Sequence, residues 1–451
     1  MMQVNFQNIV GKIKPMHAVG QPPMLATNCA YFHYLKDANI PYARLHDMGV
    51  HKLLPMVDIS CIFPDMSKDE TDPASYDFEY TDLLLAELMK NNCPPIFRLG
   101  ETIENAIGKG YRPRFVFAPA DPHKWARVCE HIIRHYNEGW ADGFTYAIEY
   151  WEIWNEPDNG FQEPDYTRQD NPHYDRNMMW VGTKEQYYEL YAVTAKHLKA
   201  CFGDSIKVGG YASSGLYAIF NDPAKYGIDE KYKKFYRQRY EFFLTFFHEF
   251  LAYVKKENAP LDFFSWHSYS DVDRTVIMGN YVIDTLEQYG FGDAEVHLNE
   301  WNNAHSAEGR GTSYACAHAT AMMLAMQNTK TYMLNYYDTR IGTSVYGGMF
   351  NPITYQPFCI YYGYMAFGEL YRLGDQARCE LDSEDIFAVA ATDGSKKAVL
   401  VANMGKDTVL TTNLEDFDVY LIDETHSLEK VEADAAKLTI GENHVLLLRS
   451  R

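Results

Sequence analysis

The chain has 451 residues, a net charge of -20 and 15% aromatic residues. This length exceeds one ordinary domain but suits a barrel of about 250 to 400 residues with one small appendage. The negative charge, with no cluster of Lys or Arg, excludes nucleic acid and anionic membrane surfaces as partners, because their phosphates would be repelled. A neutral ligand is indifferent to this charge, and tyrosine rings with a polar edge suit the faces and hydroxyls of sugars.

The eight cysteines are scattered, without a C-x-x-C motif, which predicts reduced and mostly buried thiols. The first residues lack the apolar core of a signal peptide, and no apolar run approaches the roughly 18 residues of a membrane span. We therefore expect a cytoplasmic protein without a membrane partner. No motif calls for a cofactor, and the sequence is compatible with a homo-oligomer.

Strand-like and helical segments alternate from residue 13 onward. Eight segments have strand character: 13–19, 41–46, 95–99, 150–155, 205–211, 261–267, 295–299 and 332–337. Helical periodicity follows them at 24–36, 80–90, 122–136, 184–201, 235–256, 275–289, 313–328 and 355–371. Strand followed by helix, eight times, predicts a (β/α)₈ TIM barrel over residues 13–374. Long connections at 47–77, 158–183 and 340–354 are expected to build a cleft over its C-terminal face.

The pattern changes near residue 375 to short alternating runs such as 386–390, 398–402 and 444–448. These runs predict a small antiparallel β-sandwich domain over residues 375–451. Residues 1–12 could add a strand to it.

The segment Tyr-Trp-Glu-Ile-Trp at 150–154 predicts a strand buried on both faces, and Asn155, Glu156 and Pro157 end it. In parallel α/β proteins, reacting groups collect beyond the carboxyl ends of the strands. Glu156 is therefore a candidate catalytic acid. The alternative is a plain turn followed by a solvated Asp158.

A second acidic residue, Glu300, ends the seventh predicted strand. Strands four and seven of a closed barrel face each other across its mouth, so Glu156 and Glu300 can flank one bond. Glycoside hydrolysis needs such a pair, one carboxylic acid and one carboxylate. Taken alone, Glu300 could instead cap the next helix, but the pair is harder to explain in that way.

Segments 150–158 and 297–302 resemble the acid/base and nucleophile segments of clan A retaining glycosidases. The form Trp-Glu-Ile-Trp-Asn-Glu-Pro resembles glycoside hydrolase family 39, and segments 44–46, 209–210 and 267–269 look like further positions of that family. In contrast, Asn-Glu-Trp-Asn at 299–302 is closer to the nucleophile segment of family 51 arabinofuranosidases than to the Thr-Glu-Phe usual in family 39.

The resemblance implies Glu156 as general acid/base and Glu300 as nucleophile of a double displacement that retains anomeric configuration. It implies an exo-acting β-xylosidase on plant-derived oligosaccharides, with aryl and alkyl glycosides as further substrates. An α-L-arabinofuranosidase or another clan A glycosidase is the alternative. A non-catalytic carbohydrate-binding barrel is a rival from another class, but binding alone needs no acid and nucleophile.

Several polar and aromatic residues near the predicted strand ends are candidate substrate-binding residues. Asn155 is similar to the family Asn that binds the sugar 2-hydroxyl, and Arg44 and Tyr269 are expected to donate hydrogen bonds to Glu300. Arg44 is also expected to pair with Glu152 inside the barrel. The remaining candidates are His46, His267, Trp301 and Tyr337, the last two as stacking platforms with core packing as the alternative.

His46, Asp47 and His51 are candidate metal ligands by residue type, because Asp and His are common ligands. Their spacing matches no recognised arrangement, so a solvated loop is the better interpretation and no metal is predicted.

Overall fold

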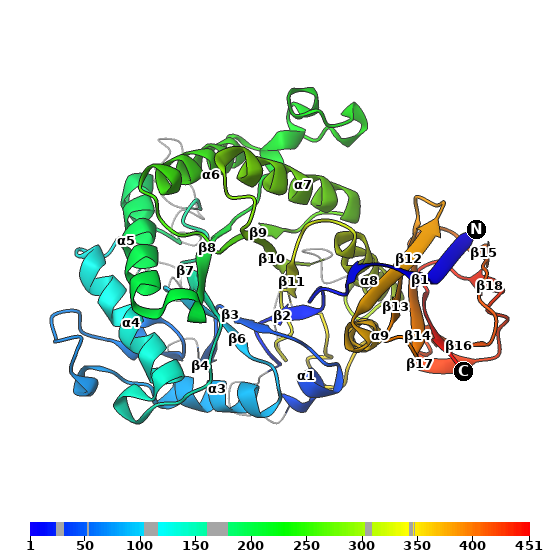
Figure 1. Ribbon diagram of the computed structural model, residues 1–451, viewed down its shortest axis with the longest axis horizontal. Coiled ribbons are helices and arrows are strands. Elements are labelled where there is room, and N and C mark those ends of the chain that lie inside the picture. Colours follow the sequence, from blue (N-terminus) through cyan, green and yellow to red (C-terminus); the bar gives the residue numbers. More distant parts are fainter. Residues whose placement is uncertain are drawn as a thin grey trace.

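The computed structural model of the protein describes residues 1–23, 31–51, 54–102, 116–159, 179–302, 309–341, 346 and 348–451. Eight parallel strands close into a barrel in the order β10-β11-β2-β3-β6-β7-β8-β9 (Figure 1). Their bounds are β2 (Ala18–Gly20), β3 (Ala43–Leu45), β6 (Pro95–Leu99), β7 (Tyr150–Ile153), β8 (Lys207–Ser213), β9 (Phe263–Ser268), β10 (Glu295–Trp301) and β11 (Met333–Tyr336). The predicted (β/α)₈ barrel is confirmed.

Helices surround the barrel (Figure 1). Their bounds are α1 (His33–Asp37), α2 (Ile59–Ile62), α3 (Glu79–Lys90), α4 (Pro122–Glu138), α5 (Lys184–Phe202), α6 (Gln238–Lys256), α7 (Val272–Tyr289), α8 (Ser313–Gln327) and α9 (Cys359–Leu373). The local sequence determines where several of these helices begin. The Asp121 side chain caps α4 ahead of a proline at the first helical position, and Thr183 with Gln186 forms a capping box on α5.

The first predicted strand and helix differ from the structure. Strand β2 begins at Ala18 rather than at residue 13, because Pro15 cannot donate a ladder hydrogen bond and the Lys14 ammonium is held by three backbone carbonyls. Of the helix predicted at 24–36, residues 24–30 lie outside the described residues, and α1 covers only His33–Asp37. Pro357 similarly delays the start of α9 to Cys359.

The barrel interior is layered. A fully buried apolar cluster lies at the start of the strands, formed by Ala18, Ile96, Tyr150, Phe263 and Met333. Polar side chains lie further along the barrel strands β3, β6, β7, β9 and β10, namely Arg44, Arg98, Glu152, Ser265 and Asn299, all buried. The apolar layer lies toward the N-terminal end of the barrel, and these buried polar side chains lie toward its C-terminal end.

The second sheet is antiparallel and has seven strands in the order β1-β12-β13-β14-β19-β16-β17. Its strands are β1 (Met2–Lys12), β12 (Asp375–Leu381), β13 (Ile386–Thr392), β14 (Lys397–Asn403), β16 (Phe417–Ile422), β17 (Ser427–Val431) and β19 (Val445–Ser450). A small second layer consists of β15 (Thr408–Thr411) and β18 (Lys437–Ile440). A further two-stranded sheet, β4 (Gly49–His51) with β5 (Leu54–Pro55), follows β3.

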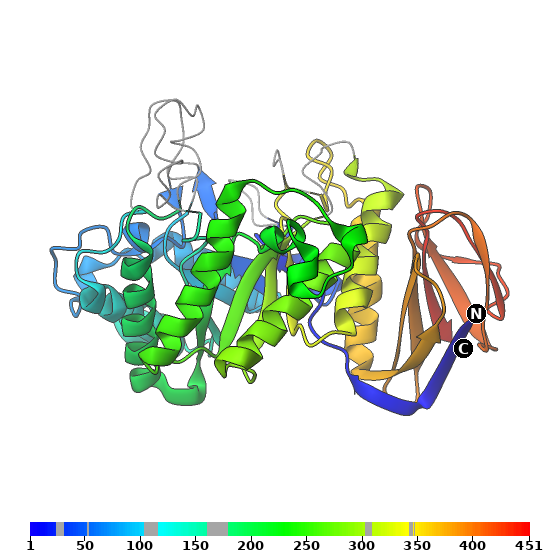
Figure 2. The ribbon, with the colours of Figure 1, turned by 90° about the horizontal axis from the view of Figure 1, so that it is seen from above.

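Both faces of this sheet are buried along its central strands, where successive apolar side chains point to opposite faces. Val445 and Leu447 of β19 belong to the main core, and the sheet packs there on α8 and α9. Leu446 and Leu448 belong to a separate core with Leu438 and Ile440 of β18. Figure 2 shows the sheet standing beside the barrel, next to these two helices.

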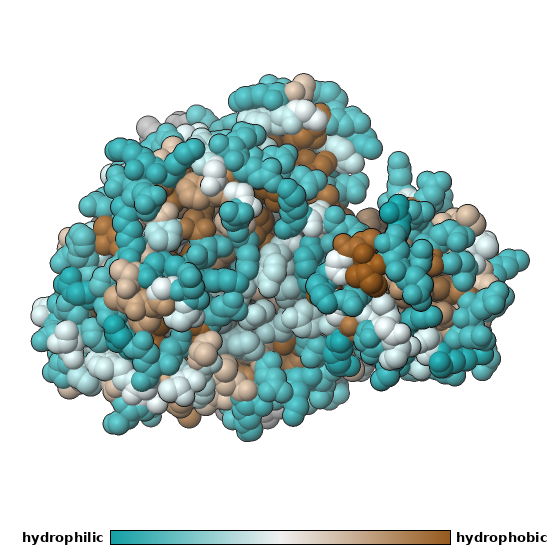
Figure 3. All heavy atoms as spheres, in the orientation of Figure 1, coloured by the Kyte–Doolittle hydropathy of each residue, from teal (hydrophilic) through white to brown (hydrophobic). Residues whose placement is uncertain are grey.

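The outer surface is mostly hydrophilic on the face seen in Figure 3, with a compact hydrophobic patch near β1. Ile9 and Val10 of this strand are among the exposed apolar residues. Among the helices that the structure describes, none combines the length and apolarity that a bilayer crossing requires.

Candidate active site

Two carboxylates meet at the C-terminal end of the barrel. Glu156 follows β7 and Glu300 lies near the end of β10, two strands that β8 and β9 separate in the barrel. Nδ1 of His267 on β9 lies 2.8 Å from Oε1 of Glu156 and 3.5 Å from Oε2 of Glu300. One oxygen of each carboxylate and a ring nitrogen of His267 lie within 4.8 Å of one another. The two acids predicted from strand ends are thus brought together.

The backbone around Glu156 is strained. Trp154 and Glu156 have φ angles of 71° and 47°, in the left-handed region that bulky residues rarely adopt. Hydrogen bonds hold this conformation: Glu156 N donates to the Ala212 carbonyl at 3.0 Å, and the Trp154 indole donates to the Met179 carbonyl at 2.7 Å. The surrounding structure therefore fixes the position of the Glu156 carboxylate.

A bulge in β10 places Glu300 in the site. Strict alternation would send consecutive residues to opposite faces, yet Asn299 donates to Glu152 and Glu300 accepts from Arg44, both inside the barrel. The register against β9 shifts between Leu298 and Glu300, so that one extra residue is accommodated there. Two consecutive side chains therefore reach the polar layer.

Arg44 connects the parts of the site. Its Nη1 donates to Glu300 Oε1 at 2.8 Å, its Nη2 to Asn155 Oδ1 at 2.7 Å, and its Nε to Glu152 Oε2 at 2.7 Å. The predicted Arg44–Glu152 pair is confirmed. Arg44, Glu152 and Asn155 are almost fully buried, so the guanidinium fork fixes the others in one geometry.

Glu300 is held by donors on both oxygens. Arg44 donates to Oε1, and the Tyr269 hydroxyl donates to Oε2 at 2.9 Å, as predicted. Burial raises the pKa of Glu300 above its ordinary value, whereas the nearby His267 and Arg44 act in the opposite direction. Donors on both oxygens favour the ionised form that a nucleophile needs.

The carboxyl of Glu156 has a raised pKa. Burial raises its pKa to about 7, against smaller opposing contributions from Asn159 and Arg239. Asn159 Nδ2 donates to Glu156 Oε2 at 3.3 Å, and Arg239 Nη2 donates to Asn159 Oδ1 at 3.0 Å. Burial also lowers the pKa of His267 to about 4, so that its imidazole is neutral near pH 7. A carboxyl that titrates near neutrality can both donate and accept a proton.

His46 and Tyr337 lie beside this pair. His46 Nε2 is 3.9 Å from Glu300 Oε1 and 3.2 Å from Asp47 Oδ1, and burial holds its pKa well below the ordinary value. The Tyr337 hydroxyl donates to Asp47 Oδ2 at 2.9 Å and receives a hydrogen bond from Gln21 at 2.7 Å. Both residues therefore border the carboxylates, and Tyr337 is anchored at its polar end.

Trp301 has a different environment from the one expected of a stacking platform. It is fully buried, and its ring packs edge-on against Tyr336 at 5.2 Å between centroids. The bulge that turns Glu300 inward leaves Trp301 in the main core. The core-packing alternative therefore holds for Trp301 in this structure.

Sequence reasoning missed Asn159 and Arg239. Asn159 belongs to the polar run that follows Glu156, which could have indicated it, whereas Arg239 comes from α6 and no local pattern points to the site. The alternative of a solvated Asp158 is wrong. Asp158 is fully buried and accepts hydrogen bonds from the hydroxyls of Ser213 and Ser214, each at 2.8 Å.

A pocket of about 400 Å³ lies beside Trp154, two residues before Glu156 in the sequence. It is lined in part by Ser60, Phe63, Glu101, Trp125 and Trp154. Glu156 and Glu300 are not among its lining residues, so the pocket is separate from the carboxylate pair. Residues 160–178 of the predicted connection at 158–183, and residues 342–345 and 347 of the one at 340–354, lie outside the described residues.

Glu156, His267 and Glu300 offer donor atoms that could hold a metal ion. The guanidinium of Arg44, at 2.8 Å from Glu300, opposes a second cation at this place. The arrangement suits acid and nucleophile chemistry better than metal binding.

The fold and the carboxylate pair define the protein as a glycoside hydrolase built on a (β/α)₈ barrel. The family model of the glycosyl hydrolases family 39 matches residues 6–328, and the chain belongs to this family.

Solved structures share the fold over the whole chain. A glucosidase from Croceicoccus marinus is 19% identical with a TM-score of 0.76, and the match covers 100% of this chain and 98% of that one. A family 39 β-xylosidase from Caulobacter crescentus is 16% identical with a TM-score of 0.69, covering 100% and 99%. A family 51 α-L-arabinofuranosidase from Bifidobacterium longum is 13% identical with a TM-score of 0.60, covering 100% and 99%.

Proposed function

We propose that this chain is a retaining, exo-acting β-xylosidase on plant-derived oligosaccharides, with Glu156 as general acid/base and Glu300 as nucleophile. The observation that carries the proposal is the approach of the two carboxylates, with oxygens within 4.8 Å of each other. Retaining enzymes place their carboxyl groups about 5 to 5.5 Å apart, whereas inverting enzymes need about 6.5 to 9.5 Å to admit a water.

In the first step, protonated Glu156 gives its proton to the glycosidic oxygen. The Glu300 carboxylate attacks the anomeric carbon from the other side, the bond to the leaving group breaks, and a glycosyl ester forms on Glu300. In the second step, the Glu156 carboxylate takes a proton from water. That water attacks the anomeric carbon, breaks the ester and releases a sugar of retained configuration.

Asn155 supports binding of the sugar. Its Oδ1 accepts from Arg44, and its Nδ2 has no partner among the described residues. This amide is available to donate to the 2-hydroxyl, a contact that strengthens at the transition state.

The choice of sugar rests on the family and on one of the solved structures that share its fold. Family 39 membership and the fold shared with the β-xylosidase from Caulobacter crescentus favour β-xylosides. Two observations favour a second candidate, an α-L-arabinofuranosidase: the family 51-like segment at 299–302 and the fold shared with the Bifidobacterium longum enzyme.

The experiment measures kcat/KM on 4-nitrophenyl β-xyloside, α-L-arabinofuranoside and β-glucoside. We expect the β-xyloside to be the best substrate, and Glu156→Ala and Glu300→Ala to lose activity. Added azide should rescue Glu156→Ala on the activated substrate as a glycosyl azide of retained configuration, because the ester on Glu300 still forms.

Glu295→Gln is the matched control. Glu295 begins the strand that carries Glu300, at the opposite end of the barrel, where it pairs with Lys207. It should keep the wild-type rate. Activity that survives in Glu300→Ala, or an azide product of inverted configuration, would contradict the proposed mechanism, whereas preference for the arabinoside would replace only the substrate.

A further inference from the structure

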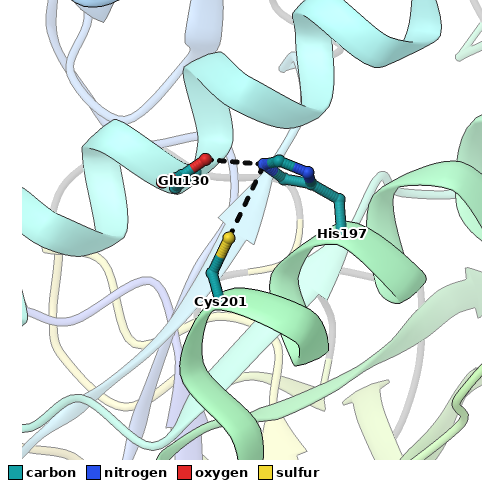
Figure 4. Close-up of side chains that lie close together, drawn as sticks. All are labelled: Glu130, His197 and Cys201. Atoms are coloured by element: carbon teal, nitrogen blue, oxygen red, sulfur yellow. Dashed lines mark hydrogen bonds and ion pairs between the residues drawn. The ribbon is translucent and has the colours of Figure 1, made fainter.

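A second cluster of metal-ligating side chains lies on the outside of the barrel, between α4 and α5. Glu130 comes from α4, and His197 and Cys201 lie one turn apart on α5, as Figure 4 shows. One donor atom from each lies within 4.8 Å of the others, and all three residues are half-buried. The reaction proposed above uses none of them.

The donor atoms converge on one point. Nε2 of His197 lies 2.6 Å from Oε2 of Glu130 and 3.8 Å from Sγ of Cys201, so the same nitrogen faces both (Figure 4). In a tetrahedral zinc site, nitrogen–sulfur separations are about 3.5 Å and nitrogen–oxygen separations about 3.3 Å, from the usual ligand bond lengths. The sulfur is thus nearly in place, and the carboxylate must move outward by about 0.7 Å as the ion replaces its hydrogen bond to His197.

The surroundings orient the carboxylate for this role. Arg134 Nε donates to Glu130 Oε1 at 2.8 Å and leaves Oε2 facing His197. Arg134 is itself held by Glu138 and packs over the Phe202 ring at 5.1 Å. Outer partners of this kind fix ligand geometry in metal sites.

We propose that Glu130, His197 and Cys201 bind a divalent transition-metal cation of the zinc type, with water as fourth ligand. The thiolate and imidazole select such an ion over Mg²⁺ or Ca²⁺. Binding displaces the thiol proton to solvent and requires the neutral His197 imidazole with its proton on Nδ1, and the Cys201 and Glu130 anions balance the charge of the ion. The ion joins α4 to α5, the helices that precede and follow the strand leading to Glu156.

The test is a titration of the full chain, stripped with chelator, with Co²⁺ under reducing conditions. The expected result is one ion per chain with a thiolate-to-metal charge-transfer band, and displacement of this band by Zn²⁺. Cys201→Ser should abolish the band, and His197→Gln should weaken binding at least about 10-fold. Arg134→Gln, which removes the outer partner, should weaken binding about 10- to 100-fold.

Cys379→Ser is the control, because Cys379 is a half-buried cysteine on β12, far from this cluster in the fold. It should leave the band unchanged. Ions bound at Glu156, His267 and Glu300 would give no sulfur band, so the readout separates the two sites. No band in the wild type, or a band that persists in Cys201→Ser, would overturn the proposal. Cys201→Ala, with the same expected loss of the band, replaces Cys201→Ser if that variant does not fold.

Discussion

The hydroxyl of Tyr269 donates a hydrogen bond to Oε2 of Glu300 at 2.9 Å, whereas Arg44 donates to the other oxygen, Oε1. Tyr269→Phe removes this donor from a buried carboxylate. Hydrogen bonds to charged groups contribute about 1.5 to 3 kcal/mol, so kcat/KM on an aryl glycoside should fall about 10- to 150-fold. Tyr364→Phe is the control, because this buried hydroxyl has no partner in the described part of the chain. Equal rates in the two variants would contradict a role for Tyr269.

The pH profile should report the Glu156 carboxyl. Because the first step needs it protonated, kcat/KM should decline as pH rises through about 7. Arg239 lowers the pKa of Glu156, so Arg239→Gln should move this alkaline limb upward by about half a unit or more. Arg237→Gln removes the same charge from an exposed position next to α6 and should leave the limb in place. A downward shift in Arg239→Gln would contradict the assignment.

Asp158 should make stability depend on pH. Burial, with a further contribution from Glu156, raises the pKa of Asp158 to about 7, so the folded state holds a proton that the unfolded state loses near pH 4. Its stabilising contribution is complete below about pH 4 and is lost as pH rises through about 7. The side chain of the Asp158→Asn variant stays neutral, so this variant should lose less stability than the wild type as pH rises. The difference between the two proteins should be about 1.4 kcal/mol for each unit by which the pKa of Asp158 differs between the folded and unfolded states. Thermal denaturation of both proteins at pH 4 to 8 tests this, and parallel curves would contradict it.

Trp301→Phe distinguishes packing from substrate stacking. Because Trp301 is fully buried, the smaller ring should lower the free energy of unfolding by about 1 to 3 kcal/mol and change KM less than about two-fold. Urea denaturation and steady-state kinetics provide the two measurements. A several-fold rise in KM at unchanged stability would restore the stacking role.

Arg44→Lys should damage both stability and activity. An ammonium cannot make the three separate contacts of the guanidinium, and loss of a buried ion-pair partner costs about 3 to 5 kcal/mol. The control is Arg378→Lys on the exposed face of β12, where a surface pair with Glu380 contributes about 1 kcal/mol or less. Similar unfolding midpoints for the two variants would be evidence against the connecting role of Arg44.

Much of the barrel could be predicted because its strands are short apolar runs with clear ends. Strand β6 matches its prediction over Pro95–Leu99, and β7 begins at the predicted Tyr150. Strand β2 shifted because contacts with residues more than 300 positions away, such as Lys14 with Thr331, determine where the ladder begins. Tertiary contacts of this kind leave no local pattern.

In the active site, too, some features could be predicted from the sequence and others could not. The position of Glu156 and Glu300 at strand ends was visible in the sequence, but the bulge in β10 was not. Simple alternation cannot show that Asn299 and Glu300 share one face, and it therefore cannot decide where Trp301 points. The link from Arg239 to Glu156 through Asn159 depends on how α6 packs and was likewise hidden.

The pairing of β1 with β12 has a consequence for biogenesis. Met2 of β1 pairs with Leu381 of β12. During synthesis β1 leaves the ribosome before the barrel, whereas β12 leaves it after the barrel. The sheet over α8 and α9 is therefore completed late in synthesis. A protease that removes β1 from the finished molecule would bare the hydrogen-bonding edge of β12 and invite self-association.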